Sequence, residues 1–264
     1  MIYFKNPAGT QVLDALHFEA QENAVSLGRY PNGANDWYRL STRTLGTSNT
    51  PPRVSMVGFN EIMYHPLVGG DDRQYIELYN RGTTNVNLGR WKLGGGISYT
   101  FPTNCVLTPK SYLVVSRNIA SLLTNYAQLN ATNAYGNFSG KLSGSGERLT
   151  LTMPDDIVST NGLGTVTTNW IDIVVDDVTY ATGGRWGRWS DGGGSSLELI
   201  DARSNKRLAA NWADSDETAK APWTIIQATG LLDNGAAIFH RCNLACSTPE
   251  NAWWTTLRPS TPAA

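Results

Sequence analysis

The chain has 264 residues, of which 41% are apolar, and its formal net charge at pH 7 is −1. This length holds one large or two small domains, and the apolar fraction is enough to build a buried core. The balanced charge gives no sign of the basic surface that a nucleic-acid-binding protein needs. Only 16% of the residues are charged, whereas 26 are Gly, 9 Trp and 11 Tyr. This composition is typical of all-β secreted domains rather than of cytosolic helical enzymes.

The first fifty residues are predicted to form short strands separated by turns. Apolar residues favour strands at 12–18, 25–27 and 36–40, and the Pro-Asn-Gly sequence within 29–33 favours a turn. Residues 44–52 have linker composition and end in two prolines. No signal peptide is visible at the start, and no apolar run approaches the ~20 residues of a membrane span.

The run 57–80 has the clearest pattern in the chain. Two alternating segments, 59–64 and 75–79, flank a turn-rich middle, and each carries one glutamate, Glu61 or Glu77, in an apolar frame. Alternation over this length between Gly and Asp clusters predicts a pair of β-strands.

One helix is expected in the rest of the chain, at residues 118–128. Its apolar residues recur at helical spacing, and Asn118 or Ser116 is its predicted N-cap. Many short strands at near-regular spacing predict a β-sandwich. These strands are expected at 87–93, 98–101, 112–116, 149–153, 169–175, 178–180 and 196–200.

Two parts of the chain resemble each other. Residues 13–18 match 175–180, which aligns Asp14 with Asp176, and residues 28–33 match 187–192 in the same order. In both parts an Asp-bearing strand leads to Gly-Arg-aromatic and a turn, which indicates an internal repeat.

The repeat suggests three regions. Residues 1–50 are interpreted as the C-terminal part of a preceding domain of the same type, and residues 51–202 as one complete domain. Residues 203–264 are interpreted as the start of a following β region with a truncated or irregular end, so that the chain could be a gene fragment.

The sequence of residues 57–153 resembles the lamin tail domain in its bacterial form. The motifs that carry the resemblance are FNEIMY at 59–64, QYIELYN at 74–80, VNL at 86–88, WKL at 91–93, YTFP at 99–102, YLVV at 112–115 and GERLTL at 146–151. The resemblance implies an immunoglobulin-like β-sandwich with one short helix, preceded here by a partial copy. It also implies a non-catalytic module of a large extracellular or cell-surface protein, with no shared active site.

Glu61 and Glu77 are the first candidate site. If their strands pair, the two carboxylates lie close enough for acid–base chemistry or for Ca²⁺. The alternative is a structural role, with hydrogen bonds to turn amides or to Arg73, Arg81 or Arg148. We favour structural strand carboxylates, because no nucleophile, histidine or metal cluster accompanies them.

Paired acidic residues at 71–72, 155–156, 176–177 and 214–217 are interpreted as oxygen-rich loops. Ca²⁺ binds six to eight oxygens, but none of these loops has the spacing of an EF-hand. We favour the interpretation that these are solvated turns, so no cofactor is expected. Binding of Ca²⁺ stays an open alternative.

The cysteines do not settle the redox compartment. There are three, Cys105, Cys242 and Cys246, which is not a disulfide framework. With His240, the last two supply only three potential zinc ligands, so no metal site is assigned.

Tryptophans offer a second candidate site. Trp186 and Trp189 lie in a glycine-rich turn and are the expected surface contacts for a sugar ring or a protein. Trp91 and Trp170 lie in segments predicted to form strands and are expected in the core.

The favoured function is a non-catalytic spacer or adhesion unit of a larger bacterial surface or secreted protein, not an enzyme. Its partner would be a protein or a cell-surface polysaccharide, with no nucleic acid and no membrane span. Two alternatives stay open: a carbohydrate-binding sandwich that uses exposed tryptophans, and an accessory fragment of a multidomain enzyme, such as a CotH-kinase-type protein, whose catalytic domain lies elsewhere.

Overall fold

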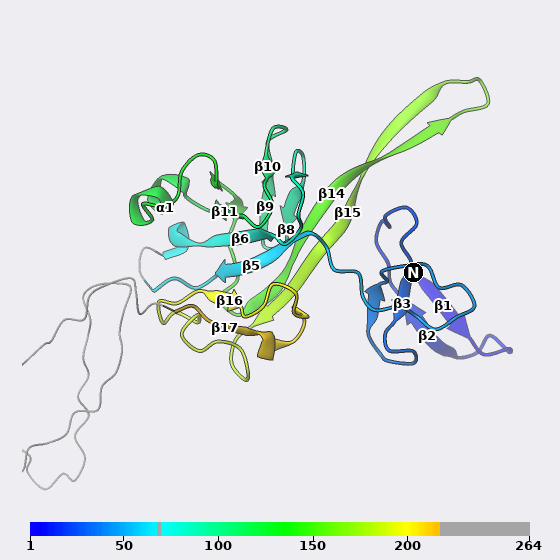
Figure 1. Cartoon of the computed structure of the whole chain (residues 1–264). Helices are drawn as coiled ribbons and strands as arrows, with labels where there is room; N and C mark the ends of the chain where they lie inside the picture. Colours follow the sequence, from blue (N-terminus) through cyan, green and yellow to red (C-terminus); the bar gives the residue numbers. More distant parts are fainter. Residues whose placement is uncertain (68–69, 217–264) are drawn as a thin grey trace, which may run out of the picture.

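A computed structural model of the chain describes residues 1–67 and 70–216, and in it two β-sheets pack as the layers of a sandwich (Figure 1). The six-stranded sheet has the order β12 (Ala134–Gly136), β11 (Tyr112–Ser116), β6 (Tyr75–Asn80), β5 (Val57–Met63), β16 (Leu197–Leu199) and β17 (Trp212–Asp214). The five-stranded sheet has the order β13 (Ser139–Gly140), β9 (Ile97–Thr100), β8 (Lys92–Gly94), β14 (Gly146–Thr160) and β15 (Val166–Ala181).

Short elements complete the sandwich. β7 (Val86–Asn87) pairs with β10 (Val106–Leu107), and the 3₁₀ turns are η1 (Gly70–Arg73) and η2 (Ala209–Asn211). The α-helix α1 (Ile119–Asn125) confirms the predicted helix, although it is shorter. Asn118 is its N-cap, since its side chain accepts a hydrogen bond from the Ser121 amide at 3.1 Å. No helix in the described ranges is long and apolar enough to cross a membrane.

The predicted strand pair of the run 57–80 is confirmed. β5 and β6 are antiparallel, and the register shifts between Phe59 and Glu61, so that Asn60 is an extra residue. Phe59 and Ile62 of β5 are fully buried, because their side chains point toward the other sheet. Full burial of such a side chain contributes roughly 1.5–3 kcal/mol.

The core lies between the two sheets. Alternate residues of each strand supply it, as the pleat of a β-strand requires. From the six-stranded sheet come Ile76, Leu78, Leu113, Val115, Leu197 and Leu199, and from the five-stranded sheet come Leu93, Ile97, Leu149, Leu151, Val178 and Tyr180.

The prediction of one strand over residues 87–93 is wrong. The chain turns between Leu88 and Trp91, whose backbone atoms form a hydrogen bond of 2.9 Å, and β8 begins only at Lys92. Gly89 explains the turn: a Cβ atom there would lie 2.5 Å from the Thr103 carbonyl oxygen. Alternation alone does not reveal this close approach.

The strands predicted separately at 149–153, 169–175 and 178–180 belong to one long hairpin of β14 and β15. Its outer part, residues 156–170, projects away from both sheets (Figure 1) and is exposed at every position. We call these residues the arm. The antiparallel ladder satisfies the backbone of this segment whatever its side chains are, which is why polar residues did not end the strands.

Residues 1–50 lie beside the sandwich, next to β14 and β15 (Figure 1). They form two small sheets, β1 (Ile2–Lys5) with β2 (Val12–Leu16), and β3 (Leu27–Arg29) with β4 (Trp37–Arg39). Neither small sheet joins the sandwich sheets. At the other end, β17 lies beyond residue 202, where the complete domain was predicted to end. The assignment of the three regions to repeated domains stays a prediction.

Candidate functional site

The outer face of the six-stranded sheet carries three glutamates in line. Glu61 of β5 lies directly opposite Glu77 of β6 on one side and Glu198 of β16 on the other. Their neighbours along each strand point into the core, so the three side chains lie on the face away from it. We call Glu77, Glu61 and Glu198 the acidic row.

Glu61 is held by hydroxyl groups. Tyr75 Oη donates a hydrogen bond to its Oε1 at 2.6 Å, and Ser196 Oγ donates to the same oxygen. Two of the arginines considered as partners lie elsewhere: Arg81 and Arg148 line a cavity, described below, together with residues 174–177 of β15. The sequence predicted correctly that the two glutamates lie close together. It did not predict the hydrogen bond from Ser196, which is 135 positions from Glu61 in the chain.

Glu77 has an unusual protonation equilibrium. Burial, followed by the neighbouring charge of Glu61, raises its pKa to about 8 against the opposing effect of a hydrogen bond from Asn60 Nδ2 at 2.9 Å. Glu77 is therefore largely protonated at pH 7. A neutral carboxyl group beside a charged one meets an electrostatic requirement for acid–base chemistry. Neither residue lines the cavity described below, however, and the structural role stays our prediction.

Two tyrosines continue the same face. Tyr79 of β6 and Tyr112 of β11 lie opposite each other, and their rings stack with centroids 4.6 Å apart. Tyr112 is 50% exposed. Burial and the nearby Tyr79 and Glu77 raise the pKa of Tyr112, so it stays a neutral hydroxyl at physiological pH. The face therefore combines carboxyl groups with an accessible aromatic surface.

The tryptophans are distributed differently from expectation. Trp186 is partly buried and packs against the core, with its ring 6.4 Å from that of Trp212, while Trp189 is 38% exposed. Trp91 packs against the core as expected. The expectation of a buried Trp170 is wrong, because it is 61% exposed on the arm, where Arg90 lies over its ring at 5.3 Å.

The arm presents apolar side chains to solvent. Five large ones are exposed in it: Ile157, Val158, Leu163, Val166 and Trp170. Ile157 and Val158 are adjacent in β14, so apolar side chains are exposed on both faces of the ribbon, where a partner could contact them. No sequence signal singled out this segment, since its length as a hairpin only emerges from the pairing of β14 with β15.

The acidic pairs are not all loops. Residues 155–156 and 176–177 lie inside β14 and β15, which corrects their assignment to turns. Within the described residues no group of three or more His, Cys, Asp and Glu side chains is arranged to hold a metal ion. Calcium binding stays an untested alternative.

Among the cysteines only Cys105 lies in the described part of the chain. It is a free thiol in the core, and burial raises its pKa. Cys242 and Cys246, with His240, lie outside the described residues, as does Glu217.

The family model described as Lamin Tail Domain matches residues 50–182, which is half of the chain. The match runs from the linker before β5 to the end of β15 and so covers most of the sandwich. No curated protein matches the chain.

Proposed function

The chain belongs to the lamin tail domain family, and on that premise we propose that it is a spacer or adhesion module of a larger bacterial surface or secreted protein. The family consists of immunoglobulin-like, non-catalytic interaction domains, and the two packed sheets have the sandwich architecture predicted from the sequence. The finer assignments, to adhesion, to bacteria and to an extracellular location, are our proposal.

The observation that carries the proposal is the arm. A two-stranded ribbon alone is marginally stable in water, yet this one extends the hairpin beyond the last core residue and exposes five large apolar side chains. Burying one such side chain in a partner contributes roughly 1.5–3 kcal/mol. An arm of this kind suits an apolar groove on a partner protein, which we propose as its target.

Shortening the arm tests this function. Replacement of residues 157–169 by Asn-Gly joins Asp156 to Trp170, which lie opposite each other, through a favoured two-residue turn. Binding is measured by a solid-phase assay on a panel of purified cell-surface proteins and insoluble polysaccharides, and release of reducing sugar is measured in the same wells. The intact chain is expected to bind at least one protein without hydrolysis, and the shortened chain to bind none.

A second variant separates apolar contact from length. Val158→Ser with Leu163→Ser keeps the full arm and is expected to weaken binding about tenfold or more. Unchanged binding by both variants would refute the arm as the contact, and hydrolysis of a polysaccharide by the intact chain would refute the non-catalytic assignment.

The outer face of the six-stranded sheet favours carbohydrate binding as a second candidate. Stacked Tyr79 and Tyr112 present an aromatic surface for the apolar face of a sugar, and the acidic row offers acceptors for its hydroxyls. This face is better placed for the task than Trp186, which packs against the core.

A glycan array distinguishes the two aromatic sites. If the sheet face binds sugar, Tyr112→Ala abolishes the array signal and Trp189→Ala leaves it intact. The reverse pattern would return the site to the turn that holds Trp186 and Trp189, and no signal from the intact chain would remove carbohydrate binding altogether.

A further inference from the structure

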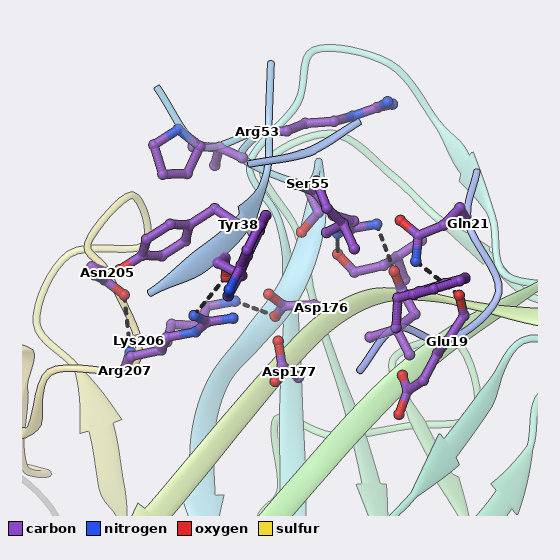
Figure 2. Close-up of a pocket in the computed structure, with 18 of the residues that line it drawn as sticks. Glu19, Gln21, Tyr38, Arg53, Ser55, Asp176, Asp177, Asn205, Lys206 and Arg207 are labelled. Carbon is purple, nitrogen blue, oxygen red and sulfur yellow. Dashed lines mark hydrogen bonds and ion pairs between the residues drawn. The ribbon is translucent and has the colours of Figure 1, made fainter. Parts of the chain in front are cut away.

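A cavity of about 720 Å³ lies between residues 1–55 and the sandwich (Figure 2). Its walls come from the segments 15–21, 37–39 and 51–55 on one side, and from β15 and the loop 203–207 on the other. This volume falls within the range of small-molecule sites, roughly 300–1,000 Å³.

Polar contacts across the cavity fasten its two walls together. Arg39 Nη1 donates a hydrogen bond to the Val174 carbonyl oxygen at 2.5 Å, and Arg39 Nη2 donates to that of Val175. Arg207 Nη1 donates to the Trp37 carbonyl oxygen at 3.0 Å. Both arginines donate here to neutral carbonyl groups rather than to carboxylates.

Asp176 and Lys206 lie at the base. Lys206 Nζ donates to Asp176 Oδ2, which also accepts a hydrogen bond from the Phe59 amide at 2.9 Å, and the two side chains are only 6% and 14% exposed. Gly58 makes room for them, since a Cβ atom there would lie 2.4 Å from Asp176 Oδ2. Asp176 is thus already occupied by the chain's own donors.

The lining carries a large excess of positive charge. Seven Lys or Arg residues and three Asp or Glu residues line the cavity, an excess of four charges in a chain whose net charge is −1. The other two carboxylates, Asp177 and Glu19, are both paired with Arg148, at 3.1 and 3.2 Å. Four of the lining arginines form no ion pair within the described residues: Arg39, Arg81, Arg203 and Arg207.

Two buried polar atoms in the wall have no partner. In the described part of the chain, Arg81 Nε lacks an acceptor and Gln21 Oε1 lacks a donor. Buried polar groups without partners are unfavourable and uncommon in native proteins. Burial also lowers the pKa of Arg81 and of Lys206, each of which is further lowered by a neighbouring arginine. The wall therefore offers one cationic donor without an acceptor and one amide oxygen without a donor.

We propose that this cavity binds a hydroxylated anion of sugar size: a uronate or a sugar that carries phosphate or sulfate. The anionic group would lie against Arg81 and Arg203, and a hydroxyl would donate toward Gln21. Ser55 and Asn205 supply further neutral polar groups in the wall (Figure 2). A cavity of this volume holds one or two sugar rings, whereas a single-stranded nucleic acid needs a longer groove that follows its backbone.

Calorimetry on the full chain at fixed ionic strength tests the proposal. The probes are trigalacturonate, glucose 6-phosphate, inorganic phosphate, neutral maltotriose and a single-stranded oligonucleotide. Saturable one-to-one binding is expected for at least one of the two sugar anions, with weaker binding of inorganic phosphate and none of maltotriose. Arg81→Gln is expected to weaken binding about tenfold or more, because a charge-assisted hydrogen bond is lost.

Two exposed arginines provide the matched comparison. Arg203→Gln removes a charge from the lining and is expected to weaken binding several-fold, which decides the matter even if Arg81→Gln does not fold. Arg185→Gln removes the same charge from a turn outside the cavity and is expected to leave binding unchanged. The proposal is overturned if no sugar anion binds, if maltotriose binds equally, if only the oligonucleotide binds, or if Arg185→Gln has the same effect as Arg203→Gln.

Neither the arm nor the acidic row lines the cavity. The chain with the shortened arm is expected to bind the sugar anion as the intact chain does, so that failure of the proposed adhesion function and failure of the cavity site give different results.

Discussion

Like charges are brought together in two places of this molecule, and the structure treats them differently. On the outer sheet face, Glu61 and Glu77 are direct neighbours, and burial, followed by the charge of Glu61, raises the pKa of Glu77 to about 8, so that protonation relieves the repulsion. In the cavity, Lys206 and Arg81 flank one carboxylate, Asp176. Arginine does not lose its proton at physiological pH, so this cluster depends on the single carboxylate.

The carboxyl row can relieve its crowding by binding a proton, whereas in the cationic cluster Arg81 keeps its charge and only Lys206 can release a proton. The first needs no ligand and is consistent with the structural role predicted for the two glutamates. The second keeps an excess of positive charge, which is why we propose an anionic ligand for it.

The largest expected effect is the loss of Asp176. Asp176→Asn leaves Lys206 buried with no carboxylate, and breaking a buried ion pair from one side destabilises a protein by roughly 3–5 kcal/mol. Urea unfolding measures this. The neighbouring Asp177→Asn removes the same charge from a more exposed pair with Arg148 and is expected to cost less than about 1 kcal/mol. Equal effects of the two substitutions would show that the buried ion pair of Asp176 with Lys206 stabilises the fold no more than the exposed pair does.

The next effect concerns pH. Because the folded pKa of Glu77 is raised from 4.5 to about 8, the folded state binds a proton that the unfolded state has released. Its contribution to stability is complete below pH 4.5 and is lost as the pH rises to about 8. At about 1.4 kcal/mol per pH unit, a fully buried group would lose roughly 5 kcal/mol between pH 4.5 and pH 8. The expected loss is roughly 2 kcal/mol, because the side chain is partly accessible to solvent.

Glu77→Gln provides the control for that pH dependence. A glutamine keeps the acceptor for Asn60 Nδ2 and has no proton to release. Thermal unfolding of this variant is expected to vary less between pH 5 and pH 8 than that of the intact chain. An identical pH profile would assign the pH dependence to another group.

Much of the fold could be predicted from the sequence because its signals are local. The alternation around Glu61 and Glu77 predicted β5 and β6, and the helical spacing predicted α1, whose cap Asn118 is one of the two predicted. The family resemblance, carried by motifs in 59–151, was confirmed by the match over residues 50–182.

What could not be predicted depends on contacts between distant residues. The hydroxyl of Ser196 on Glu61, and Lys206 on Asp176, join residues 135 and 30 positions apart. The aligned pair of the repeat illustrates the limit: Asp14 binds Arg29 through two hydrogen bonds of 2.8 Å, whereas Asp176 binds Lys206. The sequence similarity between residues 13–18 and 175–180 therefore did not predict the contacts of Asp176 in the cavity.

A smaller effect is expected for Glu61. Glu61→Gln removes the charge that helps to raise the pKa of Glu77, so that pKa is expected to fall, as carboxyl NMR titration would show. Stability is expected to change by less than about 1 kcal/mol, since the amide oxygen still accepts from Tyr75. If partner binding is lost while stability is unchanged, the acidic row belongs to the binding surface and the structural assignment is wrong.

An effect of similar size is expected for the coupling between Tyr79 and Tyr112. Their stacked rings are expected to contribute about 0.5–1.5 kcal/mol beyond buried area, a value that a double-mutant cycle isolates from the cost of each single alanine. Urea unfolding of Tyr79→Ala, Tyr112→Ala and the double variant measures it. A coupling near zero would mean that Tyr112 is held by the strand alone. The ring would then be free to adapt to a ligand, whereas a measurable coupling describes a rigid platform in place before any sugar or protein binds.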